Sequence, residues 1–363
     1  MTVMIAIAKP FVGTEEKEAV CKVIDSGMIA CGAVVEQFEK EFAAYAGTEY
    51  GIATTSGTTA LEVAIRSLGI GPGDKVLTTP FSFIASTNAI LYAGATPVFA
   101  DIDEKTFNIS VDEMEKQLAR DPQIKAVLIV HLFGQACDMD TILAFVRKHN
   151  LLLIEDCAQA HGAMYRGQRV GTFGDAAAFS FYPTKNMTTG EGGMVLTPHK
   201  EVAEKAKLLI NHGMKVRYHH DIIGYNYRMT NMAASIGLCQ LAKLDRFNEL
   251  RNRNADYYAA HIHHSDIDTP VCAQDRYHCY HQYTLRIKNG RRDAFTQYLA
   301  DNGIGFGVFY PLSIPEQLCY KEMSFPTQYP VTDVIKNEVV SIPVHPQLTT
   351  EEVETVARVI NAF

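Results

Sequence analysis

A lysine at position 185 stands in an unusual setting. It lies within FSFYPTKNMTTGEGGMV, residues 179–195, after an apolar run and before Gly190, Gly192 and Gly193. A surface lysine needs no such surroundings, whereas a lysine that reacts with a carbonyl must stay partly dehydrated, because burial lowers the pKa of its amine. We therefore predict that Lys185 is a reactive amine.

Three other groups of polar residues follow strand-like segments. Asp156 and Gln159 end the apolar stretch LLLIEDCAQ, and Ser180 ends the next apolar stretch. The tetrapeptide SGTT, residues 56–59, stands where an expected strand turns into a helix. In an open α/β sheet, ligands collect beyond the carboxyl ends of the strands, so we expect these groups to converge with Lys185 on one site.

The SGTT turn has the features of a phosphate site. The start of a helix offers free backbone N–H groups and the positive end of the helix dipole, Gly57 permits close approach, and Thr58 and Thr59 add hydroxyls. Together with a lysine and an acid, such a cradle suits pyridoxal phosphate (PLP). Lys185 would form a Schiff base with the cofactor aldehyde, and Asp156 would keep the pyridine nitrogen protonated, which makes the ring an electron sink.

The elements that must position these residues alternate along the first part of the chain. Apolar strand-like segments are linked by amphipathic helices, which predicts a mostly parallel sheet covered by helices on both faces. The expected strands are 50–57, 74–80, 96–103, 124–134 and 151–159, and the expected helices between them are 58–69, 82–94, 111–120 and 139–150. The stretches 175–182 and 192–197 have no helix between them, so they predict an antiparallel pair in a mixed sheet.

Two helices precede this alternation, and a second unit follows it. Residues 14–27 predict a helix capped by Thr14 and ended by Gly27, and residues 34–47 predict another. After about residue 245 the pattern becomes that of a smaller α+β unit, so the predicted domains are 1–245 and 246–363. The expected late elements are helices at 232–262, 291–303 and 349–363 and strands at 280–287 and 305–310.

The composition is that of an ordinary soluble globular protein. Of 363 residues, 47% are hydrophobic and 20% are charged, and the formal net charge is −8 without a basic cluster, which argues against nucleic acid as a partner. No apolar run approaches a membrane span, and the N-terminal run MTVMIAIAKPF predicts a β-segment of the mature chain rather than a leader. We therefore expect a cytoplasmic protein without a membrane partner.

Three features invite a different interpretation, and we discard each. The eight cysteines form no CxxC pair and are interpreted as reduced thiols. His261 and His264 in HIHH have no nearby cysteine or carboxylate pair, so they are interpreted as a solvated helix end, and no metal site is predicted. The stretch GIGPGD, residues 69–74, follows a helix rather than a strand, which makes it a turn and not a dinucleotide-binding loop.

A series of motifs resembles the DegT/DnrJ/EryC1/StrS family of sugar aminotransferases. In chain order they are SGTTAL, FGQACDMD, EDCAQAHGA, FSFYPTKN…GEGG and GYNYRM…AASIGLCQL, and the resemblance extends from CGAVVEQFE near residue 31 to SIPVHPQLTTEE. It implies the PLP fold-type I architecture, similar to aspartate aminotransferase, with a large α/β domain and a smaller α+β domain. It also implies transfer of the amino group of glutamate to a nucleotide-linked keto-sugar, as in polysaccharide, glycan or secondary-metabolite biosynthesis.

The resemblance assigns roles to the residues singled out above. Lys185 would form the imine, Asp156 would face the pyridine nitrogen, and Gln159 would contact the O3′ oxygen of the cofactor. Phe83, in TPFSFIAST, would stack on the cofactor ring. The phosphate ligands would be Thr58, Thr59 and Ser180.

The resemblance also implies a homodimer with shared active sites. Asn226 in GYNYRM corresponds to a residue that reaches the phosphate of the neighbouring subunit, with Arg228 as the alternative. One departure is Pro315, which stands where many relatives carry a histidine near the substrate. Retention of Lys185 favours amino transfer over the dehydration carried out by relatives with histidine there. A PLP enzyme of the dehydratase or aminohydroxybenzoate type and a non-catalytic regulatory relative stay as alternatives.

Overall fold

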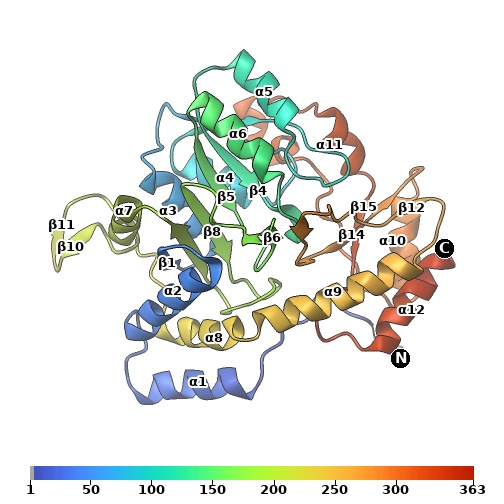
Figure 1. Ribbon diagram of the computed structural model, residues 1–363, viewed down its shortest axis with the longest axis horizontal. Coiled ribbons are helices and arrows are strands. Elements are labelled where there is room, and N and C mark those ends of the chain that lie inside the picture. Colours follow the sequence, from blue (N-terminus) through green and yellow to red (C-terminus); the bar gives the residue numbers. More distant parts are fainter. Residues whose placement is uncertain (1–3) are drawn as a thin grey trace.

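The structure is a computed structural model that describes residues 4–363 (Figure 1). Its largest sheet has seven strands in the order β1-β9-β8-β5-β4-β2-β3. Strand β9 runs antiparallel to both of its neighbours, and the other pairs are parallel. The strands are β1 (Tyr50–Thr54), β2 (Lys75–Thr78), β3 (Thr96–Phe99), β4 (Ile124–Val130), β5 (Leu152–Asp156), β8 (Ala176–Ser180) and β9 (Gly193–Thr197). The predicted mixed sheet and its antiparallel pair are confirmed.

Helices cover both faces of this sheet, because its strands are apolar on both sides (Figure 1). Along β4, Leu128 and Val130 join one hydrophobic core, while Val127 and Ile129 join the other, since successive side chains of a strand point to opposite faces. The first core is completed by α3 (Gly57–Ser67), α4 (Ala85–Tyr92) and α7 (Lys200–Ile210), and the second by α2 (Ala33–Ala46), α5 (Val111–Arg120) and α6 (Met139–His149).

The first helix differs from its prediction at its start. Helix α1 (Thr14–Asp25) begins after Gly13, so Thr14 is the first helical residue and not the cap. The Glu16 carboxylate instead accepts a hydrogen bond from the Gly13 N–H at 2.7 Å, which satisfies one free donor of the helix start. Gly27 follows the helix with a φ of +72°, so the predicted stop is confirmed.

The C-terminal part forms a three-stranded antiparallel sheet in the order β12-β14-β15. Its strands are β12 (Ile267–Asp268), β14 (Tyr283–Ile287) and β15 (Val339–Ile342), and the helices that share its core are α9 (Leu244–His261), α10 (Arg292–Asp301) and α12 (Thr350–Asn361). The expected helix over 232–262 is in fact two helices, α8 (Asn231–Leu241) and α9. The predicted domain boundary after residue 245 falls at the start of α9, and it stays a prediction.

The structure differs from two strand predictions. Residues 305–310 form no strand: Gly307 makes one bridge with Ser341, and the chain then leaves the sheet because Phe309 and Tyr310 line a cavity. In the N-terminal segment, Ile5 makes a single parallel bridge with Ile304. The first three residues of that predicted β-segment lie outside the described part of the chain.

The remaining elements are short. They are β6 (Met164–Tyr165), β7 (Gln168–Arg169), β10 (Met214–Val216), β11 (His219–His220), β13 (Arg276–Tyr277), α11 (Pro330–Ile335) and the 3₁₀ turns η1 (Leu132–Gly134), η2 (Ile314–Glu316) and η3 (Leu318–Met323). Across residues 4–363, no helix has the length and apolar character needed to cross a membrane.

Candidate active site

A cavity of about 420 Å³ lies at the carboxyl ends of β5 and β8 and at the N-terminus of α3. It brings together most of the residues that the sequence singled out, although they are spread over more than a hundred positions. Those that line it are Gly57, Thr58, Phe83, Asp156, Gln159, Ser180 and Lys185. The structure therefore brings these groups together beyond the strand ends, as expected.

Lys185 lies in the loop between β8 and β9 and faces this cavity. Within residues 4–363 its one hydrogen bond is from its backbone N–H to the Tyr182 carbonyl at 2.9 Å, so its amine has no partner in the protein. Burial lowers the pKa of Lys185 to about 8, and the Asp156 carboxylate opposes that shift. At pH 7 roughly one such amine in ten is neutral, against about one in three thousand for an ordinary lysine.

Asp156 is the last residue of β5 and is almost fully buried. One carboxylate oxygen accepts a hydrogen bond from Ser86 Oγ at 2.7 Å, and the other accepts one from the Ala158 N–H at 3.0 Å. Burial raises the pKa of this carboxyl, although both hydrogen bonds and the positive charge of Lys185 act in the opposite direction. The carboxylate is thus stabilised by positive charge, and a cationic group placed against Asp156 in addition to Lys185 would be held strongly.

The N-terminus of α3 reaches the cavity because its first residue is glycine. A Cβ at Gly57 would lie 2.5 Å from the Cβ of Ser180, so no larger residue allows this helix end to approach β8 so closely. Ser56 caps the helix by accepting a hydrogen bond from the Thr59 N–H at 3.2 Å. Thr58 lines the cavity, whereas Thr59 does not, and the Thr59 hydroxyl donates to the Ser56 carbonyl at 2.9 Å.

Gln159 is held in a fixed orientation at the cavity wall. Its Oε1 accepts a hydrogen bond from the Phe133 N–H at 2.8 Å, and its Nε2 donates to the Tyr310 hydroxyl at 3.0 Å. Phe83 also lines the cavity but is 54% exposed, with its ring centroid 6.1 Å from that of Tyr310. An aromatic face is therefore available at the rim of the cavity.

Several lining residues were not singled out from the sequence. They include Ser86, Tyr182, Glu191, His281, Gln282 and Tyr310. His281 and Gln282 stand just before the apolar strand β14, at a position where polar residues often mark a loop, so their signal in the sequence is weak. Tyr310 is the last residue of the stretch 305–310, whose composition predicts a strand, so the sequence does not indicate its place in the cavity.

Three residues tied to the resemblance lie away from the cavity. Asn226 is exposed and follows the β10–β11 hairpin, and Arg228 is bound within the chain by a 2.6 Å hydrogen bond from its guanidinium to Asn211 Oδ1. Pro315 is buried in η2 and does not line the cavity.

Glu155, the neighbour of Asp156 on β5, points to the opposite side of the strand and makes hydrogen bonds to two loops. Its carboxylate accepts hydrogen bonds from the N–H groups of Gly171, Phe173 and Gly174, each at 2.8 Å. It also pairs with His131 Nε2 at 2.9 Å. These contacts fix the chain on both sides of the strand that carries Asp156.

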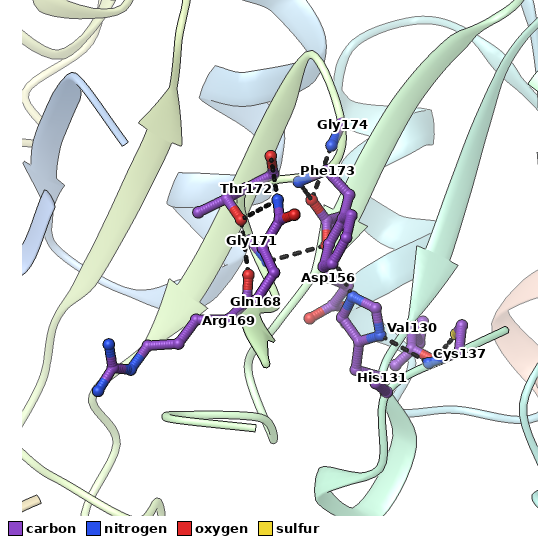
Figure 2. Close-up of polar contacts among 12 residues, drawn as sticks. Val130, His131, Cys137, Asp156, Gln168, Arg169, Gly171, Thr172, Phe173 and Gly174 are labelled. Carbon is purple, nitrogen blue, oxygen red and sulfur yellow. Dashed lines mark hydrogen bonds and ion pairs between the residues drawn. The ribbon is translucent and has the colours of Figure 1, made fainter. Parts of the chain in front are cut away.

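The same region contains a cluster of possible metal ligands. Side-chain atoms of His131, Glu155 and Cys157 lie within 4.8 Å of one another. However, His131 Nδ1 accepts a hydrogen bond from the Cys137 N–H at 3.0 Å, so its Nε2 carries the proton that it donates to Glu155 (Figure 2). Hydrogen bonding within the protein thus accounts for both His131 and Glu155 without a metal.

A partly dehydrated lysine, a buried carboxylate and a helix N-terminus thus meet at the carboxyl edge of a mostly parallel sheet, an arrangement that could hold a phosphorylated aldehyde. The chain belongs to the DegT/DnrJ/EryC1/StrS aminotransferase family, whose model matches residues 10–361. The predicted family and fold type are confirmed.

Individual relatives match over nearly the whole chain. The UDP-N-acetyl-3-dehydro-alpha-D-glucosamine 3-aminotransferase of Acidithiobacillus ferrooxidans is 39% identical over 340 residues, which are 93% of this chain and 91% of that protein. The dTDP-3-amino-3,6-dideoxy-alpha-D-galactopyranose transaminase of Aneurinibacillus thermoaerophilus is 40% identical over 350 residues, 96% of this chain and 95% of that protein. Among solved structures, the PLP form of Spr1654 from Streptococcus pneumoniae has a TM-score of 0.93 and 28% identity, covering 99% of this chain and 98% of that one.

Proposed function

We propose that the chain is a PLP-dependent aminotransferase that moves the amino group of glutamate onto a keto-sugar attached to a nucleotide. The observation that carries this proposal is that Lys185, Asp156 and the N-terminus of α3 line one cavity. The family membership and the substrates named for the two relatives above support it. Those relatives differ in their nucleotide, so the proposal extends to the class of substrate and not to one sugar.

The residues present fit the proposed cofactor. Asp156 is a buried carboxylate whose two hydrogen-bond donors, Ser86 and Ala158, are neutral, so it is suited to a protonated pyridine nitrogen. The close approach of Gly57 to Ser180 brings the α3 N-terminus into the cavity, where Thr58 and Ser180 would hold a phosphate group. Thr59 is left out of this set, because its hydroxyl is used within the helix cap.

When bound, PLP supplies an aldehyde that joins to amino groups and a ring that withdraws electrons from the carbon bearing the amine. Lys185 would take the proton from Cα of glutamate and later return a proton to the sugar carbon that receives the amine. Its lowered pKa supports this role, because the same group must accept and release a proton near neutral pH. Gln159, held by Phe133 and Tyr310, would orient the cofactor through its O3′ oxygen, and Phe83 would stack on its ring.

We further propose that two copies share their active sites. Arg228 is engaged within its own chain, whereas the side chain of Asn226 is exposed beside the β10–β11 hairpin. This difference supports Asn226, rather than Arg228, as the residue that reaches the cofactor phosphate of a partner subunit. Mass measurement in solution and the effect of Asn226→Ala on PLP affinity would test this point.

The function is tested by a two-step assay. The purified protein is first incubated with PLP and glutamate, and 2-oxoglutarate is measured. The aminated protein is then mixed separately with UDP-, dTDP- and GDP-linked keto-sugars, and the products are analysed by mass spectrometry. Amino-sugar formation that is lost in Lys185→Met would support the proposal.

The alternatives give different results in the same assay. A dehydratase would remove water from the sugar without retaining the amino group, so the product mass would fall instead of reflecting the exchange of oxygen for an amine. A regulatory relative would bind no PLP and release no 2-oxoglutarate. Either result would overturn the proposed function.

A further inference from the structure

A second, much smaller cavity shares part of its wall with the main one. It has a volume of about 20 Å³, and Ala8, Thr184 and Lys185 line both cavities. Two further residues of its wall, Asn186 and Arg251, do not reach the main cavity. A space of this size suits one water molecule, which needs about 10–15 Å³ and two to four polar partners.

Arg251 lines this small cavity and has an unpaired donor. It lies on α9 with 5% of its surface exposed, and its Nη1 donates to the Tyr280 carbonyl at 3.0 Å. Its Nε is buried and has no hydrogen-bond partner among the described residues. A buried guanidinium N–H without an acceptor is costly, so an acceptor is expected close to Nε.

Asn186 brings an unpaired acceptor to the same cavity. It is 4% exposed, and its Nδ2 donates to Asn248 Oδ1 at 2.8 Å and to the Cys279 carbonyl at 2.9 Å. Both amide hydrogens are therefore used, which fixes the orientation of the side chain. Its Oδ1 is buried and has no partner within residues 4–363. The two residues that carry this donor without an acceptor and this acceptor without a donor thus line one water-sized space.

We propose that this cavity holds one resident water molecule that accepts a hydrogen bond from Arg251 Nε and donates one to Asn186 Oδ1. The water keeps one lone pair and one hydrogen, which are available to the amine of Lys185. It can accept from the charged amine or donate to the neutral amine, so it serves both protonation states. Arg251 and Asn186 are then positioning residues that act on Lys185 through the water.

The chemistry of the walls favours water over an anion. Arg251 and Lys185 would both attract a chloride ion, but Asn186 Oδ1 carries a partial negative charge and would repel it. Only a ligand that both accepts and donates satisfies Arg251 Nε and Asn186 Oδ1 at once. A water molecule is the smallest ligand with that property.

Crystal structures of three forms of the cofactor-free protein test the site directly. The wild type is expected to show one water peak within hydrogen-bond distance of Arg251 Nε and Asn186 Oδ1, and Arg251→Met is expected to lose it. Arg253→Met is the matched control, because Arg253 lies on the same helix but bonds to Asn254 and Leu348 and does not line the cavity. A dry cavity in the wild type, a water retained in Arg251→Met, or a strong anomalous peak at the site after bromide soaking would overturn the proposal.

A kinetic measurement tests the effect on Lys185, and this part rests on the proposed function. In Arg251→Met, the single-turnover rate with glutamate should fall about tenfold, the worth of one hydrogen bond, while the KM for glutamate changes less than twofold. Arg251→Lys, which keeps the charge but lacks Nε, should show the same loss and serves if the Met variant does not fold. An unchanged rate in a well-folded Arg251 variant would refute the positioning role. Failure of the proposed function would appear differently, as a water peak in a wild-type protein that does not react with glutamate.

Discussion

Glu155→Gln is expected to destabilise the folded protein by about 3–5 kcal/mol. One carboxylate oxygen of Glu155 accepts from the N–H groups of Phe173 and Gly174, and the other accepts from Gly171 N–H and His131 Nε2. Glutamine offers a single oxygen, so at least two of these four donors would face an amide NH₂ group. Each lost hydrogen bond to a buried charged acceptor is worth roughly 1.5–3 kcal/mol, and relief from burying a charge offsets part of the sum.

Urea unfolding followed by circular dichroism would measure this loss, with Glu113→Gln as the matched control. Glu113 forms an exposed pair with Lys116 on α5, and such a pair contributes about 0.5 kcal/mol or less. If Glu155→Gln shifted the free energy of unfolding by no more than Glu113→Gln, the Glu155 carboxylate could not be what holds these loops.

The pH dependence gives an independent check on the same residue. Burial raises the pKa of Glu155, but the hydrogen bonds from His131 and the backbone N–H groups outweigh burial and hold it below the ordinary 4.5. A carboxyl whose pKa is lowered on folding contributes stability above its unfolded pKa and loses it as the pH falls through the folded value. The difference between wild type and Glu155→Gln should therefore be full at pH 7 and shrink below about pH 4.5. A difference that stays constant from pH 7 to pH 3 would contradict this reasoning.

Three further substitutions probe the cavity. Lys185→Met should abolish amino transfer, and in urea unfolding at pH 7 it should be more stable than the wild type. Folding lowers the pKa of Lys185 from 10.5 to about 8, so the difference in the free energy of unfolding should shrink as the pH rises from 8 to 10.5. Asp156→Asn keeps an oxygen that accepts from the Ala158 N–H, its NH₂ can donate to the Ser86 hydroxyl, and a buried charge is removed, so its thermal midpoint should not fall. The single-turnover rate with glutamate should drop at least about a hundredfold. Gly57→Ala would place a Cβ 2.5 Å from that of Ser180. It should lower the free energy of unfolding in urea by about 1–3 kcal/mol and weaken PLP binding measured by dialysis. Full PLP affinity in this variant would refute the argument that the helix end must approach Ser180 closely.

The sheet could be predicted from the sequence because its signals are local and repeated. The segment IKAVLIV is short and apolar at nearly every position, which is typical of a strand buried on both faces, and β4 indeed contributes to both cores. The convergence of most candidate site residues on one cavity could be predicted for a related reason. Asp156, Ser180 and the SGTT turn each sit at the end of a strand or the start of a helix, and parallel strands bring such ends to one edge.

One strand prediction failed because a side chain has a tertiary partner that leaves no local pattern. Tyr310 ends a stretch, GFGVFY, whose composition is typical of a strand. The chain nevertheless leaves the sheet there, and the Tyr310 hydroxyl accepts a hydrogen bond from Gln159, which is 151 positions away.

Helix α9 has a polar face whose burial no local pattern indicates. Asn248, Arg251 and Asn254 recur at the spacing of one helical face, and polar residues in that pattern ordinarily indicate a face in water. In this protein that face is buried, and its side chains donate to the carbonyls of His161, Tyr280 and His345. Main-chain carbonyls of loops leave no trace in composition or periodicity, so a polar face that caps them cannot be told from a solvated one. The residues that fix the loops around the cavity are therefore the hardest to identify from the sequence.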